Sequence, residues 1–208
     1  MIIYLIRHGQ TDANFKKIFC GYTDVLLNSF GKKEVLSLQK NIKKNKNHEL
    51  NNVDKIYCSD LVRAIETAKI LFPHRRIKKN PGFREIHLGL FEGLNIEEIK
   101  LQYPQHFNKW MKEQLKFNFP NGESNSKFKS RVITTYREIK NNMSTTSNVA
   151  SVAVVTHGGT ISQIINHIMK SNDFFRYLPP NASVTKLEVI SQRKTVINYF
   201  GKTAGSIQ

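Results

Sequence analysis

Residues 2–6 read IIYLI, an unbroken apolar and aromatic run that stops abruptly at Arg7, His8 and Gly9. A short run of this kind, rich in β-branched residues, is typical of a strand covered on both faces, as in a parallel sheet. In open α/β folds, ligands bind just beyond the carboxyl ends of such strands. We therefore expect Arg7 and His8 to face a binding site rather than the core.

The same arrangement recurs late in the chain. The apolar run at residues 152–155 is followed by Thr156, His157, Gly158 and Gly159. Isoleucines at three- and four-residue spacing then predict a helix, and its first backbone N–H groups, at the glycines, should be free to hold an anion. One His-Gly after a strand can be a simple turn, but the repeated pattern is hard to obtain from turn chemistry alone.

A further predicted strand, residues 53–58, brings Arg63 to the same region. Ser59 is a good N-cap for the helix that runs from there to Pro73, and Arg63 lies in the first turn of that helix. Ligand sites of parallel sheets form at the edge where the strands' carboxyl ends meet. Two arginines and two histidines should therefore lie together at one edge of the sheet.

Predicted strands alternate with amphipathic helices, such as the one at residues 31–46. This alternation and the length of 208 residues favour a single α/β domain over residues 1–208. We expect a three-layer α/β/α sandwich, with a mostly parallel central sheet and helices on both faces. A closing hairpin is predicted at residues 184–190 and 195–200, and residues 201–208 are predicted to be a frayed tail.

Residues 94–143 are expected to form a helical, cap-like segment of this domain. Asn95 and Glu98 resemble a capping box at the start of its first helix. A second short helix is predicted to bury Phe107, Trp110 and Met111.

The chain is strongly basic, with 32 Lys and Arg against 16 Asp and Glu, for a net charge of +16. This charge suits nucleic acid, an anionic membrane or a small anionic substrate. The basic pairs are spread along the chain without interleaved aromatic residues, so we expect no nucleic acid as the main partner. Cys20 and Cys58 match neither a metal knuckle nor a redox pair, and no apolar run approaches membrane length. A cytoplasmic protein without a membrane partner is predicted.

The expected cluster suits a phosphoryl group, because guanidinium forks and backbone amides match its peripheral oxygens. The positive charges of Arg7 and Arg63 should keep His8 neutral, so that its imidazole can attack phosphorus directly. His157 would donate to a peripheral oxygen as charge develops on it. Zinc is the other common use for two histidines, but there is no His-Glu-x-x-His motif, and arginines beside the ligands would oppose a cation.

Glu85 is the candidate proton donor for the leaving oxygen. It lies in residues 83–93, a segment without clean periodicity that contains charge and glycine. An alternative role for Glu85 is a simple ion pair with Arg84. Glu123 is expected either to cap the next helix or to contact substrate.

Five segments together resemble the histidine phosphatase superfamily. They are Arg7 to Thr11, Cys58 to Ala64, Arg84 to Gly93, Pro120 to Ser124 and Thr156 to Gly159. The resemblance implies a phosphohistidine at His8, phosphate held by Arg7, Arg63 and His157, Glu85 as proton donor, and neither metal nor cofactor. It also implies secondary contacts near Asn14 and Gln10, and we include Gly21 and Gly158 among the expected phosphate or substrate contacts.

Within that superfamily the short stretch at residues 94–122 resembles the phosphatase branch more than the mutases. The residues around Phe91 and residues 119–124 are most similar to α-ribazole phosphatases of cobalamin biosynthesis and to broad-specificity phosphatases. A small phosphorylated substrate and a monomer or homodimer are expected. Two alternatives remain: a phosphoglycerate mutase, and a non-catalytic basic module that binds phosphate or nucleic acid.

Overall fold

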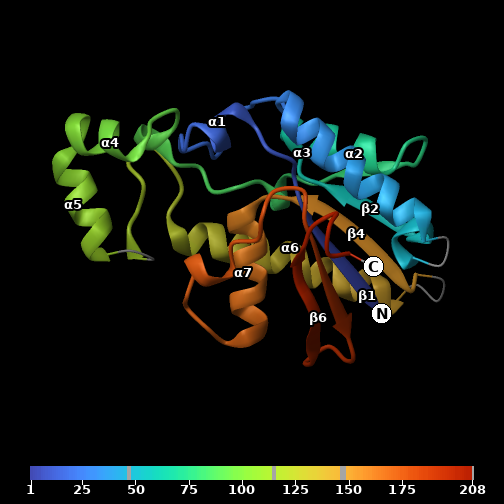
Figure 1. The fold of residues 1–208 in the computed structure, drawn as a ribbon. Coiled ribbons are helices and arrows are strands. Elements are labelled where there is room, and N and C mark those ends of the chain that lie inside the picture. Colours follow the sequence, from blue (N-terminus) through green and yellow to red (C-terminus); the bar gives the residue numbers. More distant parts are fainter. Residues whose placement is uncertain (46–47, 114–115, 146–148, 208) are drawn as a thin grey trace.

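The computed structural model describes residues 1–45, 48–113, 116–145 and 149–207. Among these residues, six strands form one sheet in the order β3-β2-β4-β1-β5-β6. The strands are β1 (Ile2–Arg7), β2 (Lys55–Cys58), β3 (Ile77–Lys79), β4 (Ser151–Thr156), β5 (Val184–Val189) and β6 (Thr195–Lys202). The first four in the sheet order are parallel, and β5 and β6 are antiparallel additions at one side. The predicted mostly parallel sheet and its closing hairpin are confirmed (Figure 1).

Helices cover both faces of the sheet (Figure 1). The α-helices are α1 (Asp12–Phe15), α2 (Ser29–Lys44), α3 (Val62–Leu71), α4 (Ile96–Gln102), α5 (Pro104–Glu113), α6 (Asn125–Thr145) and α7 (Gly158–Met169). Short 3₁₀ turns include η1 (Glu49–Asn52), η2 (Pro81–Phe83), η3 (Gly89–Phe91) and η5 (Phe175–Tyr177).

Two apolar cores lie on opposite faces of the sheet, because successive strand residues point in opposite directions. Ile3 and Leu5 of β1 pack on the side of α6 and α7, whereas Tyr4 and Ile6 pack on the side of α2 and α3. The expected three-layer α/β/α sandwich is therefore confirmed.

The segment expected to form a cap divides into two parts. Helices α4 and α5 stand apart from the sheet (Figure 1), and the predicted capping box at Asn95 and Glu98 is present. Helix α6 instead packs on the sheet and contributes Phe128 and Val132 to its core, so the projecting part is shorter than residues 94–143.

The prediction that α5 buries three apolar side chains is wrong. Met111 is 45% exposed, and Phe107 and Trp110 are only partly buried. Helix α5 contacts a cluster of aromatic side chains around Phe91 through Trp110, whose ring lies 5.6 Å from that of Phe91. A helix that projects from the sheet has less apolar surface to cover it.

The prediction of a frayed tail is wrong for residues 201–207. Strand β6 extends to Lys202, and Ile207 is buried in the core on the α2 and α3 side. The side-chain amide of Asn41 also donates to the carbonyl of Ala204 at 2.5 Å. Gln208 lies outside the described residues. Within the described part of the chain, no helix is long and apolar enough to cross a bilayer.

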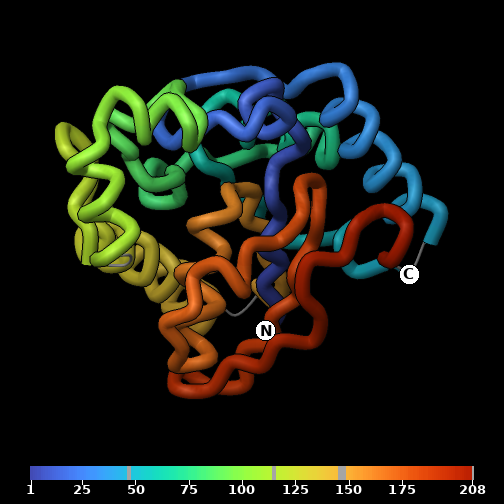
Figure 2. Tube along the Cα trace, turned by 60° about the vertical axis from the view of Figure 1, so that its left-hand side comes forward, coloured from blue at the N-terminus to red at the C-terminus, as the bar shows by residue number. Residues whose placement is uncertain are grey.

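The sheet order brings the expected site together. Strand β4 lies between β1 and β2, and the β1–β4 register pairs Arg7 with Thr156 at the carboxyl ends. The loop after β1 continues toward α4 and α5 (Figure 2), where the N–H of Phe19 donates to the carbonyl of Leu94 at 2.8 Å. The projecting helices are thereby fixed beside the edge of the sheet that carries the charged side chains.

Candidate active site

Two histidine rings pack against each other at the carboxyl ends of β1 and β4. The backbone N–H of His8 donates to the carbonyl of Thr156 at 3.0 Å, which sets the ends of β1 and β4 side by side. As a result the rings of His8 and His157 meet edge to face with centroids 5.2 Å apart. The two side chains are 4% and 0% exposed, respectively, and the predicted pairing of the two His-Gly motifs is thus present.

His8 is held as a neutral imidazole. Its pKa lies well below the usual 6.5, chiefly because the ring is buried and then because Arg63 and Arg7 are close. The direction agrees with the expectation from sequence, but burial contributes more than either charge. The Nδ1 atom lies 2.8 Å from the carbonyl oxygen of Gly9. Since a carbonyl only accepts, Nδ1 carries the hydrogen, and Nε2 keeps the lone pair of a nucleophile.

Arg7 lies against the first residue of α7. A Cβ at Gly158 would approach the Arg7 guanidinium carbon to 3.2 Å, so glycine allows this close packing. Arg7 Nη1 donates to the carbonyl of Pro179 at 2.5 Å, while Nε is buried without a partner among the described residues. Burial lowers the pKa of Arg7, but an arginine remains cationic at neutral pH. A buried, unpartnered donor of this kind is suited to an anion.

Arg63 is 2% exposed and is clamped by the loop that precedes α2. Its Nη1 donates to the carbonyl of Thr23 at 3.0 Å, and its Nη2 donates to the carbonyl of Gly21 at 2.7 Å. The guanidinium is therefore fixed in orientation before any ligand binds, which lowers the entropy lost when it holds a phosphoryl group.

One carboxylate organises the loop that holds Arg63. Glu92 accepts from the N–H groups of Gly21, Tyr22 and Thr23, from the Thr23 hydroxyl and from the N–H of Leu88, at 2.7–3.2 Å. Burial alone would raise the pKa of Glu92, but these bonds outweigh it and lower the pKa. The sequence does not predict this role of Glu92, because its partners in the loop that holds Arg63 lie about 70 residues away.

Glu85 lies in the cavity with both oxygens engaged. Oε2 accepts from the N–H of Gly159 at 2.8 Å and Oε1 from the N–H of Ile86 at 3.0 Å. Burial raises the pKa of Glu85 despite these bonds and the nearby arginines, so Glu85 keeps its proton to a higher pH than an ordinary glutamate. Arg84 pairs with Asp60 instead. The N–H of Gly159, expected to be free for an anion, is occupied by this carboxyl group.

Ser59 orients His157 rather than capping the following helix. The N-cap of α3 is Leu61, without a side-chain cap, and the Ser59 hydroxyl lies 2.8 Å from His157 Nε2. That hydroxyl accepts from the N–H of Leu61, so its own hydrogen can go to Nε2. In this arrangement the hydrogen of the ring is on Nδ1, which is buried and without a partner among the described residues. The prediction of Ser59 as the N-cap is wrong.

The sequence matches the histidine phosphatase superfamily (branch 1) over residues 3–200. The chain belongs to this superfamily. A broad-specificity phosphatase of Saccharomyces cerevisiae is 29% identical over 203 residues, which cover 94% of this chain and 82% of the relative. Among solved structures, the fold of this chain is similar to that of the α-ribazole phosphatase of Shigella flexneri, with a TM-score of 0.86 at 19% identity. The match covers 97% of this chain and 96% of that one.

A third relative bears on the alternative activity. A 2,3-bisphosphoglycerate-dependent phosphoglycerate mutase of Pelagibacter ubique is 36% identical over 102 residues, which cover 47% of this chain and 41% of the relative. The family assignment and the class of enzyme, a phosphatase, are nevertheless confirmed by the family match over residues 3–200 and by the yeast relative that covers most of the chain.

The histidine phosphatase site opens into a cavity of about 900 Å³. Arg7, His8, Arg63, Glu85 and Gly158 line it, together with Asn14. The Asn14 side-chain oxygen accepts from Thr11 and Asn181, so its amide nitrogen is the atom available to a ligand. The walls are largely apolar and include Phe19, Trp110, Met111, Phe119, Phe174 and Phe175.

Three expected contacts lie elsewhere in this histidine phosphatase. Gln10 does not line the cavity, and its side-chain oxygen accepts from Asn28. The N–H of Gly21 is taken by Glu92 and its carbonyl by Arg63, so Gly21 acts on the guanidinium. His157 lies beneath His8 without lining the cavity. Across the described residues, no three His, Cys, Asp or Glu side chains gather where they could hold a metal ion.

Proposed function

We propose that this histidine phosphatase hydrolyses phosphomonoesters through a covalent phosphohistidine at His8. One observation carries the proposal: a neutral imidazole and a carboxyl group with raised pKa share one cavity with two guanidinium groups. This set provides a nucleophile, a proton donor and charge for the phosphoryl oxygens.

In the first step, His8 Nε2 attacks phosphorus while Arg7 and Arg63 hold the peripheral oxygens. The P–N bond forms and the ester P–O bond breaks. The leaving oxygen takes the proton of Glu85, which becomes a carboxylate. His157 does not line the cavity, so its part in this step is to hold the ring of His8, against which it packs edge to face.

In the second step, water replaces the released alcohol in the cavity. The Glu85 carboxylate removes a proton from this water as its oxygen attacks phosphorus. The P–N bond breaks, inorganic phosphate leaves, and both His8 and Glu85 return to their starting protonation. No metal or cofactor enters either step.

The apolar walls of the cavity support a substrate whose alcohol portion carries a bulky aromatic ring system. We propose α-ribazole 5′-phosphate of cobalamin biosynthesis as this substrate. Aromatic and aliphatic side chains from α5 and from residues 171–178 form the walls above the phosphate end. Such walls contribute about 25 cal/mol for each Å² of apolar surface that a ligand buries. The fold likeness to an α-ribazole phosphatase is consistent with this substrate.

The distribution of charge argues against the mutase alternative. Among the described residues that line the cavity, the cations are Arg7 and Arg63, both at the phosphate end, and the remaining charged residues are Glu85 and Asp173. A bisphosphoglycerate carries a second phosphate and a carboxylate, which would then lie among apolar and acidic groups.

A panel of phosphomonoesters tests the substrate proposal. We expect kcat/KM for α-ribazole 5′-phosphate and for aryl phosphates to exceed that for 3-phosphoglycerate and phosphoserine by at least ~10-fold. Met111→Ser should reduce this preference because Met111 lines the cavity, whereas Leu101→Ser, an equally apolar change on an exposed side chain, should not. Efficient isomerisation of 3-phosphoglycerate with a bisphosphoglycerate primer, without net release of phosphate, would contradict hydrolysis.

A further inference from the structure

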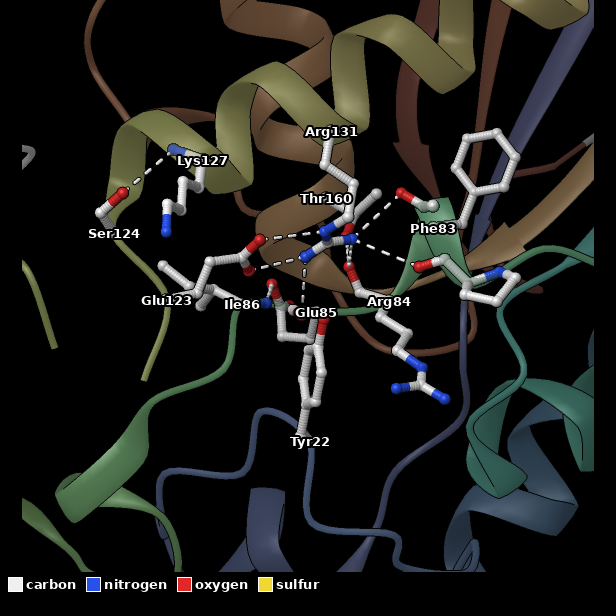
Figure 3. Close-up of polar contacts among 12 residues, drawn as sticks. Tyr22, Phe83, Arg84, Glu85, Ile86, Glu123, Ser124, Lys127, Arg131 and Thr160 are labelled. Carbon is white, nitrogen blue, oxygen red and sulfur yellow. Dashed lines mark hydrogen bonds and ion pairs between the residues drawn. The ribbon is translucent and has the colours of Figure 1, made fainter. Parts of the chain in front are cut away.

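Arg131 of α6 reaches the backbone of the segment that carries Glu85 (Figure 3). Its Nη1 donates to the carbonyls of Gly82 and Arg84, both at 3.1 Å. Its Nη2 donates to the carbonyl of Glu85 itself at 3.3 Å. One guanidinium group thus fixes three backbone carbonyls in the stretch from Gly82 to Glu85.

A second carboxylate holds Arg131 in place. Glu123 accepts from Arg131 Nε at 3.0 Å and from Nη2 at 2.7 Å, in a two-pronged pair (Figure 3). The backbone N–H of Glu123 also donates to the carbonyl of His87 at 2.8 Å. Both side chains are mostly buried, with exposed fractions of 22% for Arg131 and 13% for Glu123. The fork is therefore preset and is held away from bulk water.

Glu85 is consequently held at both ends. Its backbone carbonyl accepts a hydrogen bond from Arg131 Nη2, and its carboxyl group accepts one from the N–H of Gly159 at the start of α7. Arg131 does not line the cavity, so it does not reach the substrate. Proton transfer depends steeply on the distance and direction of the donor, and a displacement of 1 Å can cost about 100-fold in rate.

We propose that Arg131, oriented by Glu123, is a positioning residue that holds the carboxyl group of Glu85 in line with the leaving oxygen. This inference rests on the proposed role of Glu85 as proton donor. Arg131 acts through its fork of hydrogen bonds to the backbone. A single ammonium group cannot replace that fork, because it lacks the planar arrangement of donors.

The test compares leaving groups in the full-length protein. Arg131→Met should lower kcat for an alkyl phosphate by at least ~10-fold more than kcat for p-nitrophenyl phosphate, whose leaving group needs no proton. Arg131→Lys should recover little of this loss. Lys140→Met is the matched control, since Lys140 also lies on α6 and donates to a backbone carbonyl, that of Gln192, without contact to Glu85. The control should leave the ratio of the two rates unchanged.

A cycle with Glu85→Gln separates the two proposals. If both residues act through the same proton, adding Arg131→Met to Glu85→Gln should lower the alkyl rate no further. Equal losses for both esters in Arg131→Met, full recovery in Arg131→Lys, or additive losses in the double variant would overturn the positioning role. Failure of Glu85→Gln itself to discriminate between leaving groups would instead overturn Glu85 as the donor.

Folding of each variant is checked by circular dichroism at the assay temperature. If Arg131→Met does not fold, Glu123→Gln replaces it, because this change keeps the arginine and removes one prong of its partner. Glu123→Gln is expected to shift the leaving-group ratio in the same direction by a smaller factor. An unchanged ratio in folded Glu123→Gln would contradict the proposal.

Discussion

His8→Ala is expected to lower kcat for p-nitrophenyl phosphate by ~10⁴-fold or more, as is usual when a nucleophile is removed. The reason is geometric. Among the cavity-lining residues described, no second histidine takes the place of His8, because His157 lies beneath it and makes its hydrogen bond through Nε2 to Ser59. Steady-state release of p-nitrophenol measures the loss.

His74→Asn is the control for this experiment. His74 is an exposed histidine with a backbone φ of 64°, a conformation that asparagine tolerates. Full activity is expected in this variant. The alternative of a non-catalytic basic module predicts instead that any slow hydrolysis is the same in wild type and His8→Ala. Retention of more than about one per cent of wild-type kcat in folded His8→Ala would also remove His8 from the nucleophile role.

Glu85→Gln is expected to lower kcat for alkyl phosphates by ~10²–10³-fold, within the range for loss of a general acid. For p-nitrophenyl phosphate the loss should be smaller than ~10-fold, since p-nitrophenolate leaves without a proton. Glutamine keeps one oxygen for the N–H of Gly159 and has no acidic proton. Rates for a series of esters with graded leaving-group pKa values measure the difference.

Wild type and Glu85→Gln are expected to differ in the pH dependence of kcat. The pKa of Glu85 is raised by burial, so wild-type kcat for an alkyl ester should stay high above the usual 4.5 and fall as pH rises through the raised pKa. Glu85→Gln should lack this fall. The pKa of His8 is lowered, so the nucleophile stays neutral as pH drops through 6.5, and no loss of rate is expected there. A wild-type rate that rises with pH in place of the fall would contradict an acid at Glu85.

The arrangement of the sheet and its two histidines could be predicted from sequence because a local pattern carried it. An apolar strand followed by His-Gly occurs at His8 and again at His157, and adjacency of parallel strand ends then brings the two together. The neutral state of the His8 imidazole is also predicted from sequence, because the positive charges of Arg7 and Arg63 are expected beside it. The burial of His8, which contributes most to the lowered pKa, could not be predicted, because it depends on distant residues such as Asn181 and Ala182, which donate to the His8 carbonyl.

The supporting groups could not be predicted because their partners are far apart in the sequence. Ser59 has the local features of a helix cap, but its hydroxyl meets His157. Glu92 and Arg131 act on backbone atoms of distant loops, and backbone contacts leave no pattern in the side chains of those loops. The docking of residues 201–207 could not be predicted for a similar reason, because it depends on the contacts of Ala204 and Ile207 with a distant core.

The most direct test of the account is to trap the phosphorylated enzyme. Wild-type protein is mixed rapidly with ³²P-labelled p-nitrophenyl phosphate and quenched in alkaline denaturant. The account predicts one labelled peptide, carrying phosphate on His8, that keeps its label in alkali, loses it in acid and is absent from His8→Ala. An initial burst of p-nitrophenol without such a label, or a label on another residue, would contradict a phosphohistidine at His8.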